Sequence, residues 1–254
     1  LLQGARNAKV NAGASGNLQV ATAIQPMNIP TGVVNRAMGD VHRGGNPHFL
    51  SDPLGGLKVA RLIRDKLIEL RPQQKTYFED HYAAFATRLC SLLVGEELAK
   101  KYSVEEAEKL ALLFQYGKLE SFLKSQDQDR LLGGWLGIML PYYGASAVDD
   151  HDMWPYFARI FGIKIVAHLE PKPGIPPTTQ HLGTVVDLVK REKVRVILAN
   201  AFYDPRHARL VSQQTGAKVV SMAHQVGARS GTDDYLSMLD YNVKQLAAAL
   251  KEGE

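Results

Sequence analysis

The 254-residue sequence lacks several features that would place it in a narrow class. Its one cysteine, Cys90, excludes an internal disulfide framework and a cysteine-rich zinc or iron–sulfur site. No run of about 18 apolar residues occurs, so no segment is predicted to span a bilayer. With 30 Lys and Arg against 26 Asp and Glu, the net charge is only +4 and no long basic run exists, so nucleic acid is not an expected partner.

The first residues, Leu1 and Leu2, are not followed by the apolar run of a signal peptide, so we expect a processed or truncated start. The apolar fraction of 45% is typical of a globular protein. Residues 1–54 are rich in Gly, Asn and Pro, and the apolar run at 20–24 predicts a short strand.

Two amphipathic helices are predicted next. Asp52 and Pro53 introduce the first helix, and Pro72 ends it. The second helix covers about residues 73–94. Its apolar side chains recur at steps of three and four, as expected for a packed helix: Phe78, Tyr82, Phe85, Leu89 and Leu92. Residues 95–132 are charged and helical, and Ser103 with Glu106 has the pattern of a capping box. We expect no chemistry in this segment.

From residue 161 the pattern alternates between strand and helix. Strands are predicted at 164–167, 194–199 and 218–222, and helices at about 179–191, 204–215 and from 233 onward. This alternation is typical of a parallel sheet with crossover helices, an α/β architecture. Ligands bind such sheets beyond the carboxyl ends of the strands. The loops after Ala167, Ala199 and Met222 are therefore candidate binding loops.

Eight histidines are the candidate metal ligands, because neutral imidazole is the commonest metal-binding side chain. No H-E-x-x-H motif and no pair at i, i+4 spacing occurs, so a metal site must be assembled from distant segments. His48 follows Pro47, which favours a fixed direction for its side chain. His151 lies among three carboxylates that can orient it. Glu170 opens a proline-rich loop, and we expect it to be structural.

Four motifs occur in order along nearly the whole chain. They are Asn-Pro-His at 46–48 with Asp-Pro at 52–53, His151 followed by Trp-Pro-Tyr-Phe at 154–157, Glu-Pro-Lys-Pro-Gly-Ile-Pro-Pro at 170–177, and Asp-Tyr at 234–235 with Asp-Tyr-Asn at 240–242. Together they resemble the metal-binding solute receptors of bacterial zinc and manganese ABC importers. Each motif is weak alone, and the specificity lies in their order.

The resemblance implies two Rossmann-like α/β lobes with parallel sheets, joined by one long rigid helix, with the metal between the lobes. The expected division is a partial N-terminal lobe at 1–72, the linking helix at 73–94, a helical insertion at 95–135 and the C-terminal lobe at 136–254. The first histidine of the family is expected upstream of Leu1, so the N-terminal lobe is expected to be incomplete.

The resemblance also assigns metal ligands. His48 matches the histidine of the Asn-Pro-His loop, and His151 matches the ligand before the aromatic helix. The fourth family position, often Asp, falls near His224, which we take as the third candidate ligand. His42 and His168 are lesser candidates, and we expect packing or surface roles for the other three: His81, His181 and His207. An imidazole-rich site without cysteine favours zinc over manganese.

The implied function is capture of a divalent ion, Zn²⁺ or Mn²⁺, as cargo outside the cytoplasm, with delivery to an ABC-type permease. We expect a monomer without enzymatic activity, either periplasmic or anchored to the membrane through an upstream N-terminus. One alternative is a zinc-dependent hydrolase in which Glu170 or Asp150 serves as the general base toward a metal-bound water. The other is a metal-binding surface adhesin of the same fold.

Overall fold

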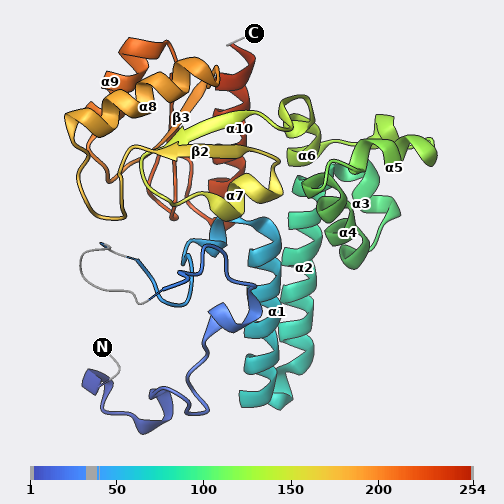
Figure 1. Ribbon diagram of the computed structural model, residues 1–254. Helices are drawn as coiled ribbons and strands as arrows, with labels where there is room; N and C mark the ends of the chain where they lie inside the picture. Colours follow the sequence, from blue (N-terminus) through green and yellow to red (C-terminus); the bar gives the residue numbers. More distant parts are fainter. Residues whose placement is uncertain (1–2, 33–38, 40, 253–254) are drawn as a thin grey trace.

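The C-terminal half of the chain contains a four-stranded parallel sheet (Figure 1). This computed structural model describes residues 3–32, 39 and 41–252. The strand order is β2-β1-β3-β4, and the strands are β1 (Ser146–Asp149), β2 (Lys164–His168), β3 (Val196–Asn200) and β4 (Lys218–Met222). The strands predicted near 164, 194 and 218 are confirmed. Strand β1 was not predicted, because four residues are too few to show a periodic pattern.

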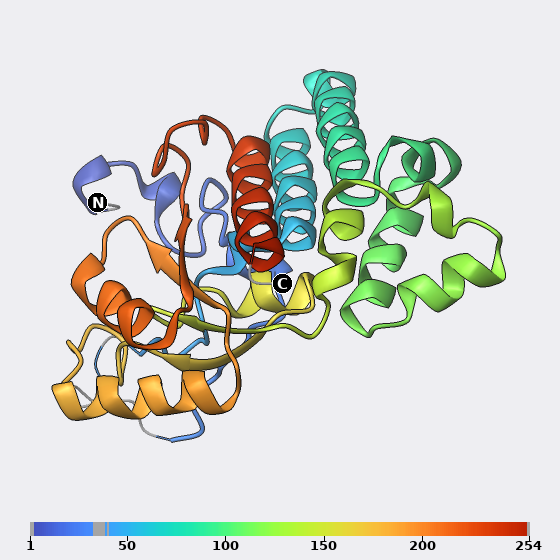
Figure 2. The ribbon, with the colours of Figure 1, turned by 90° about the horizontal axis from the view of Figure 1, so that it is seen from above.

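Helices cover both faces of the sheet (Figure 2). Helices α8 (Thr179–Arg191) and α9 (Pro205–Thr215) pack against one face, where the side chain of Ile197 is buried with theirs. Helices α7 (Pro155–Ile160) and α10 (Tyr235–Lys251) lie against the other face, where Val196 and Leu198 are buried. Neighbouring residues of β3 thus point to opposite faces, as a strand requires.

Two long helices, α1 (Pro53–Leu70) and α2 (Lys75–Val94), lie side by side in the helical half of the molecule (Figure 1). Short helices follow: α3 (Glu96–Lys101), α4 (Val104–Gln115), α5 (Leu119–Ser125) and α6 (Gly134–Met139). The predicted capping box of α4 is present. Buried side chains of this half join the core beneath the sheet, so both halves share one hydrophobic cluster. We propose α2 as the helix that links the lobes.

The mixed α/β architecture with a parallel sheet confirms the expected fold class. The strand predicted at 20–24 is wrong, because Val20–Ala23 forms a 3₁₀ turn. No strand is present among the described residues before α1, so this segment has no partner for its backbone and bonds to itself instead: Ile24 donates to the carbonyl of Ala21. Within the described ranges, no helix is both long and apolar enough to cross a membrane.

Candidate metal centre

A cavity of about 280 Å³ lies at the carboxyl ends of β1 and β2, where the rule for parallel sheets places ligands. The loop at 41–48 closes it from the N-terminal part of the chain, and the loops after β1 and β2 line its other walls. Its lining includes four histidines and two carboxylates: His42, His48, His151, His168, Asp152 and Glu170. The predicted ligands His48 and His151 are therefore brought together.

The Asn-Pro-His loop is tied to the loop after β1. Asn46 accepts the amide hydrogen of His48 at 3.0 Å through Oδ1 and donates from Nδ2 to the carbonyl of Asp152 at 2.6 Å. The hydroxyl of Tyr156 donates to the carbonyl of Asn46 at 2.9 Å. The side chain of Asn46 thus sets the position of the His48 backbone relative to the strand ends.

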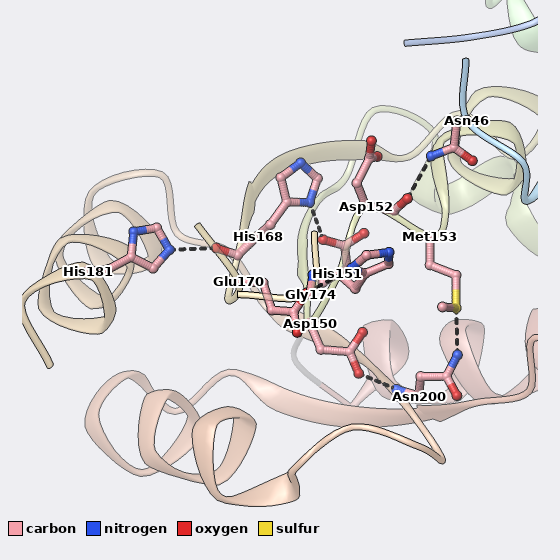
Figure 3. Close-up of polar contacts among 11 residues, drawn as sticks. Asn46, Asp150, His151, Asp152, Met153, His168, Glu170, Gly174, His181 and Asn200 are labelled. Carbon is pink, nitrogen blue, oxygen red and sulfur yellow. Dashed lines mark hydrogen bonds and ion pairs between the residues drawn. The ribbon is translucent and has the colours of Figure 1, made fainter. Parts of the chain in front are cut away.

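His151 has the arrangement of a metal-binding imidazole. Its Nδ1 lies 2.8 Å from Oε2 of Glu170, and both side chains are only 11–12% exposed (Figure 3). A carboxylate accepts only, so Nδ1 carries the proton and Nε2 keeps the lone pair needed for a metal. The rings of His48 and His151 are 5.8 Å apart at an interplanar angle of 82°.

The carboxylates nearest in sequence do not orient His151, which corrects that expectation. Asp149 pairs with His168 at 2.5 Å, and Asp150 accepts the amide hydrogen of Asn200 at 2.6 Å (Figure 3). Asp149 and Asp150 lie at the end of β1, next to β2 and β3, so they bond to those neighbouring strand ends. The partner of His151 is Glu170, which comes from the loop after β2.

His224 follows β4, and the ring of Phe202 packs edge-on against it with centroids 5.0 Å apart. Its Nδ1 is buried without a hydrogen-bond partner among the described residues, and burial lowers its pKa. The charge of His224 also acts on His48. Across the described residues, however, no three His, Cys, Asp or Glu side chains are grouped closely enough to enclose a metal ion.

Burial keeps His48 neutral. It lowers the pKa of His48 to about 4, and the charges of His151, His224 and His42 lower it further. A neutral imidazole is the form that binds a metal. Burial also raises the pKa of Asp150 to about 7.

The other histidines have separate roles. His181 lies 3.0 Å from the carbonyl of His168 through Nε2, and His81 is bonded to the carbonyl of Tyr77 on α2. His207 lines a different cavity beside Asp150.

One contact of the site could not be anticipated from residue types. Tyr203, from the loop between β3 and α9, stacks on His151 at 5.3 Å with an interplanar angle of 20°. The same loop supplies Phe202 to His224, so one loop holds two of the candidate ligands. In the sequence, the only indication of a role for this loop is that it follows a predicted strand. It is the loop after Ala199, one of the three candidate binding loops.

Comparison with known proteins identifies the family. The model for the zinc-uptake complex component A, periplasmic, matches residues 3–107 and 139–249. The zinc-binding lipoprotein AdcA of Streptococcus pneumoniae is 24% identical over 210 residues, 81% of this chain and 34% of its own length. The iron-binding protein YfeA of Yersinia pestis is 22% identical over 205 residues, 80% of this chain and 54% of its own. This chain therefore spans between a third and about half of these relatives.

Solved structures agree on the fold. The laminin-binding adhesin Lmb of Streptococcus agalactiae superposes with a TM-score of 0.61 at 22% identity, over 92% of this chain and 70% of that one. A crystal structure of ZnuA gives 0.58 at 18% identity, over 91% of this chain and 68% of that one. At these identities the likeness shows the fold alone. Because the family model matches well over half of the residues, the chain belongs to the family of periplasmic zinc-uptake component A proteins.

Proposed function

We propose that this chain is the extracytoplasmic receptor of a metal importer. It binds a divalent transition metal, zinc in first place and manganese in second, and delivers it to an ABC-type permease. The observation behind this proposal is the meeting of His48 and His151 in one cavity, with ring centroids 5.8 Å apart. Imidazole ligands without cysteine suit zinc. The named relatives include zinc-binding AdcA and the manganese transporter lipoprotein PsaA of Streptococcus pneumoniae.

The hydrogen bonds of the site favour a receptor over a hydrolase. A metal-dependent hydrolase needs a general base directed at the metal-bound water. Oε2 of Glu170 already accepts from His151 and from the amide of Gly174. Oδ2 of Asp150 accepts the amide hydrogen of Asn200. Glu170 thus orients His151, and Asp150 is not among the residues that line the cavity of His48 and His151, so we propose no enzymatic activity.

The test is metal content, measured by elemental analysis after purification without chelator and with zinc and manganese offered together. We expect about one tightly held zinc per chain, and its loss in His48→Ala and in His151→Ala with an unchanged circular dichroism spectrum. His81→Ala, which removes a histidine on α2 remote from the cavity, is the matched control. Unchanged zinc in both site variants would refute the site.

Two further assays separate the alternatives. Metal-dependent hydrolysis of simple esters or phosphates by the parent, lost in His48→Ala, would point to the hydrolase. The adhesin alternative is motivated by the fold likeness to laminin-binding Lmb. It requires attachment to an extracellular ligand that survives the loss of His48. Metal binding without either activity is the outcome expected of a receptor.

A further inference from the structure

The ring of Tyr203 lies nearly parallel to the imidazole of His151. The two ring centroids are 5.3 Å apart and the ring planes differ by 20°. This is the offset-stacked arrangement that aromatic rings prefer. Tyr203 comes from the loop between β3 and α9, whereas His151 follows β1, so only the fold brings the two rings together.

The hydrogen bond to Glu170 fixes only part of the orientation of His151. It holds Nδ1 at 2.8 Å from Oε2 of Glu170, but a ring held at one atom can still tilt about that bond. Such a tilt moves Nε2, the nitrogen that keeps the lone pair for a metal. A second contact, made against the face of the ring, stops this motion, and the stacked ring of Tyr203 provides it.

The loop that carries Tyr203 is anchored on both sides of this residue. Oδ1 of Asn200, whose side chain is buried, accepts the amide hydrogen of Phe202 at 3.3 Å. On the other side, Asp204 accepts the amide hydrogen of Arg206 and caps α9. Because the loop is held at both ends, the ring that it carries can hold a second ring in place.

A second cavity lies beside Tyr203. This cavity of about 300 Å³ is lined by Tyr203, whereas His151 lines the cavity of about 280 Å³ that contains His48. Glu170 lines both, so Tyr203 and Glu170 separate the two cavities at His151. Loss of the tyrosine ring would therefore leave one face of the imidazole next to open space instead of a packed side chain.

We propose that Tyr203 is a positioning residue of the metal centre, and that its ring fixes the plane of the His151 imidazole so that Nε2 faces the ion. The inference rests on the proposed function, since it assigns a further residue to the same centre. A bound metal withdraws electrons from the imidazole, and the electron-rich face of a tyrosine ring attracts an electron-poor group more strongly. The stack therefore stabilises the metal-bound form more than the metal-free form.

The experiment measures cobalt and zinc binding by the chelator-treated chain. The visible absorption spectrum of bound cobalt reports the geometry of its ligands, and competition with a chromogenic chelator gives the zinc affinity. Tyr203→Ala removes the ring, Tyr203→Phe keeps it, and Tyr203→Leu fills the space without an aromatic face. Tyr116→Ala, at a tyrosine that is 66% exposed and lines neither cavity, is the matched control. Circular dichroism establishes that each variant is folded.

We expect Tyr203→Ala to bind zinc about tenfold more weakly than the parent, through loss of the stacked ring. Its cobalt spectrum at saturation differs from that of the parent, because His151 no longer holds one orientation. Tyr203→Leu shows the same two changes, Tyr203→Phe restores both the affinity and the spectrum, and Tyr116→Ala behaves as the parent does. A purely structural role of the tyrosine would lower the melting temperature and leave the cobalt spectrum unchanged.

Parental zinc affinity and an unchanged cobalt spectrum in Tyr203→Ala, or in Tyr203→Leu if the alanine variant does not fold, would overturn the positioning role and leave the proposed function intact. A Tyr203→Phe variant that binds as weakly as Tyr203→Ala would overturn it equally, since the stacked ring would then not be the group that matters. A parent that binds neither zinc nor cobalt would refute the proposed function itself.

Discussion

A carboxylate that accepts a hydrogen bond from one ring nitrogen of a histidine leaves the other nitrogen free to bind a metal. Glu170 holds His151 through Nδ1 and also accepts the amide hydrogen of Gly174, so it joins the proline-rich loop to the ligand. We expected Glu170 to be structural, and these two hydrogen bonds give it an orienting role. His48, by contrast, is positioned through its backbone by Asn46.

The role of Glu170 predicts the effect of its loss. Glu170→Gln removes the negative charge that fixes the Nδ1 tautomer of His151, so zinc affinity is expected to fall about 10- to 100-fold. Competition with a chromogenic chelator measures this change. Glu192→Gln, at the exposed end of α8, is the control and is expected to bind as the parent does. Equal affinity in Glu170→Gln would contradict the assigned role.

Burial of His48 predicts a pH dependence of the metal-free protein. Its pKa is about 4 in the fold, below the ordinary 6.5 that the unfolded chain regains. Between these values the unfolded chain binds more protons, so the contribution of His48 to stability is lost as pH falls through this window. The raised pKa values of Asp149 and Asp150 act in the opposite direction.

The comparison with His48→Asn isolates this contribution. The loss of melting temperature between neutral pH and about pH 5 is expected to be smaller in His48→Asn than in the parent, because the variant lacks the imidazole that titrates. Thermal melts by circular dichroism in a chelating buffer measure it. Parallel pH profiles for the two proteins would show that His48 titrates normally in the fold.

At the scale of helices, the close crossing of α2 and α6 depends on glycine. Gly95 ends α2 with φ of +89°, and a Cβ there would lie 2.7 Å from Cα of Gly133. Gly95→Ala is therefore expected to lower the free energy of unfolding by more than about 1 kcal/mol, through backbone strain and the clash. Chemical denaturation measures this loss.

Gly183 provides the opposite case. It lies inside α8 with open space around a built Cβ, so Gly183→Ala is expected to raise stability by about 0.5–1 kcal/mol. Equal effects of the two substitutions would show that the α2–α6 contact does not require a glycine.

Helices α4 to α6 are integral to the core although the family match does not cover them fully. That match stops at residue 107 and resumes at 139. Phe114, Leu119 and Trp135, from the unmatched stretch, are at most 1% exposed and belong to the same cluster as the sheet residue Val196. We still propose that residues 95–135 form an insertion. Because side chains of this segment are packed in the main hydrophobic core, the segment cannot be removed without exposing that core.

At the scale of the whole molecule, the metal would join distant parts of the chain. His48 lies before α1 and His151 lies after β1, so an ion bound to both connects the first part of the chain to the sheet. An ion that binds only the folded state stabilises it, by about 4.1 kcal/mol at a free concentration 1,000 times Kd.

We therefore expect zinc to raise the melting temperature of the parent by several degrees, following the zinc concentration. His48→Ala is expected to lose most of this rise, while His81→Ala keeps it. Differential scanning calorimetry with and without zinc makes the measurement. A rise of the same size in His48→Ala would place the stabilising ion elsewhere.

Local features of the sequence determined the helices and most strands. Asp52 and Pro53 at the start of α1 and the Ser103–Glu106 capping box lie where the sequence predicted them, and α9 lies within the predicted range of 204–215. Each of these features depends on residues only a few positions apart in the sequence, so it can be identified without knowledge of the tertiary structure. The ordered motifs also indicated the family, which the comparison confirms.

Only the tertiary structure decided which side chains pair. The partner of His151 is Glu170 and that of His168 is Asp149, because parallel strands place the loops after β1 and β2 at one edge of the sheet. Strand β1 was missed because four residues carry too little pattern. The strand predicted at 20–24 is wrong because no partner strand lies beside it in the part of the chain that the structure describes. Strand pairing and ligand orientation both depend on contacts between segments far apart in the sequence, and local patterns do not encode them.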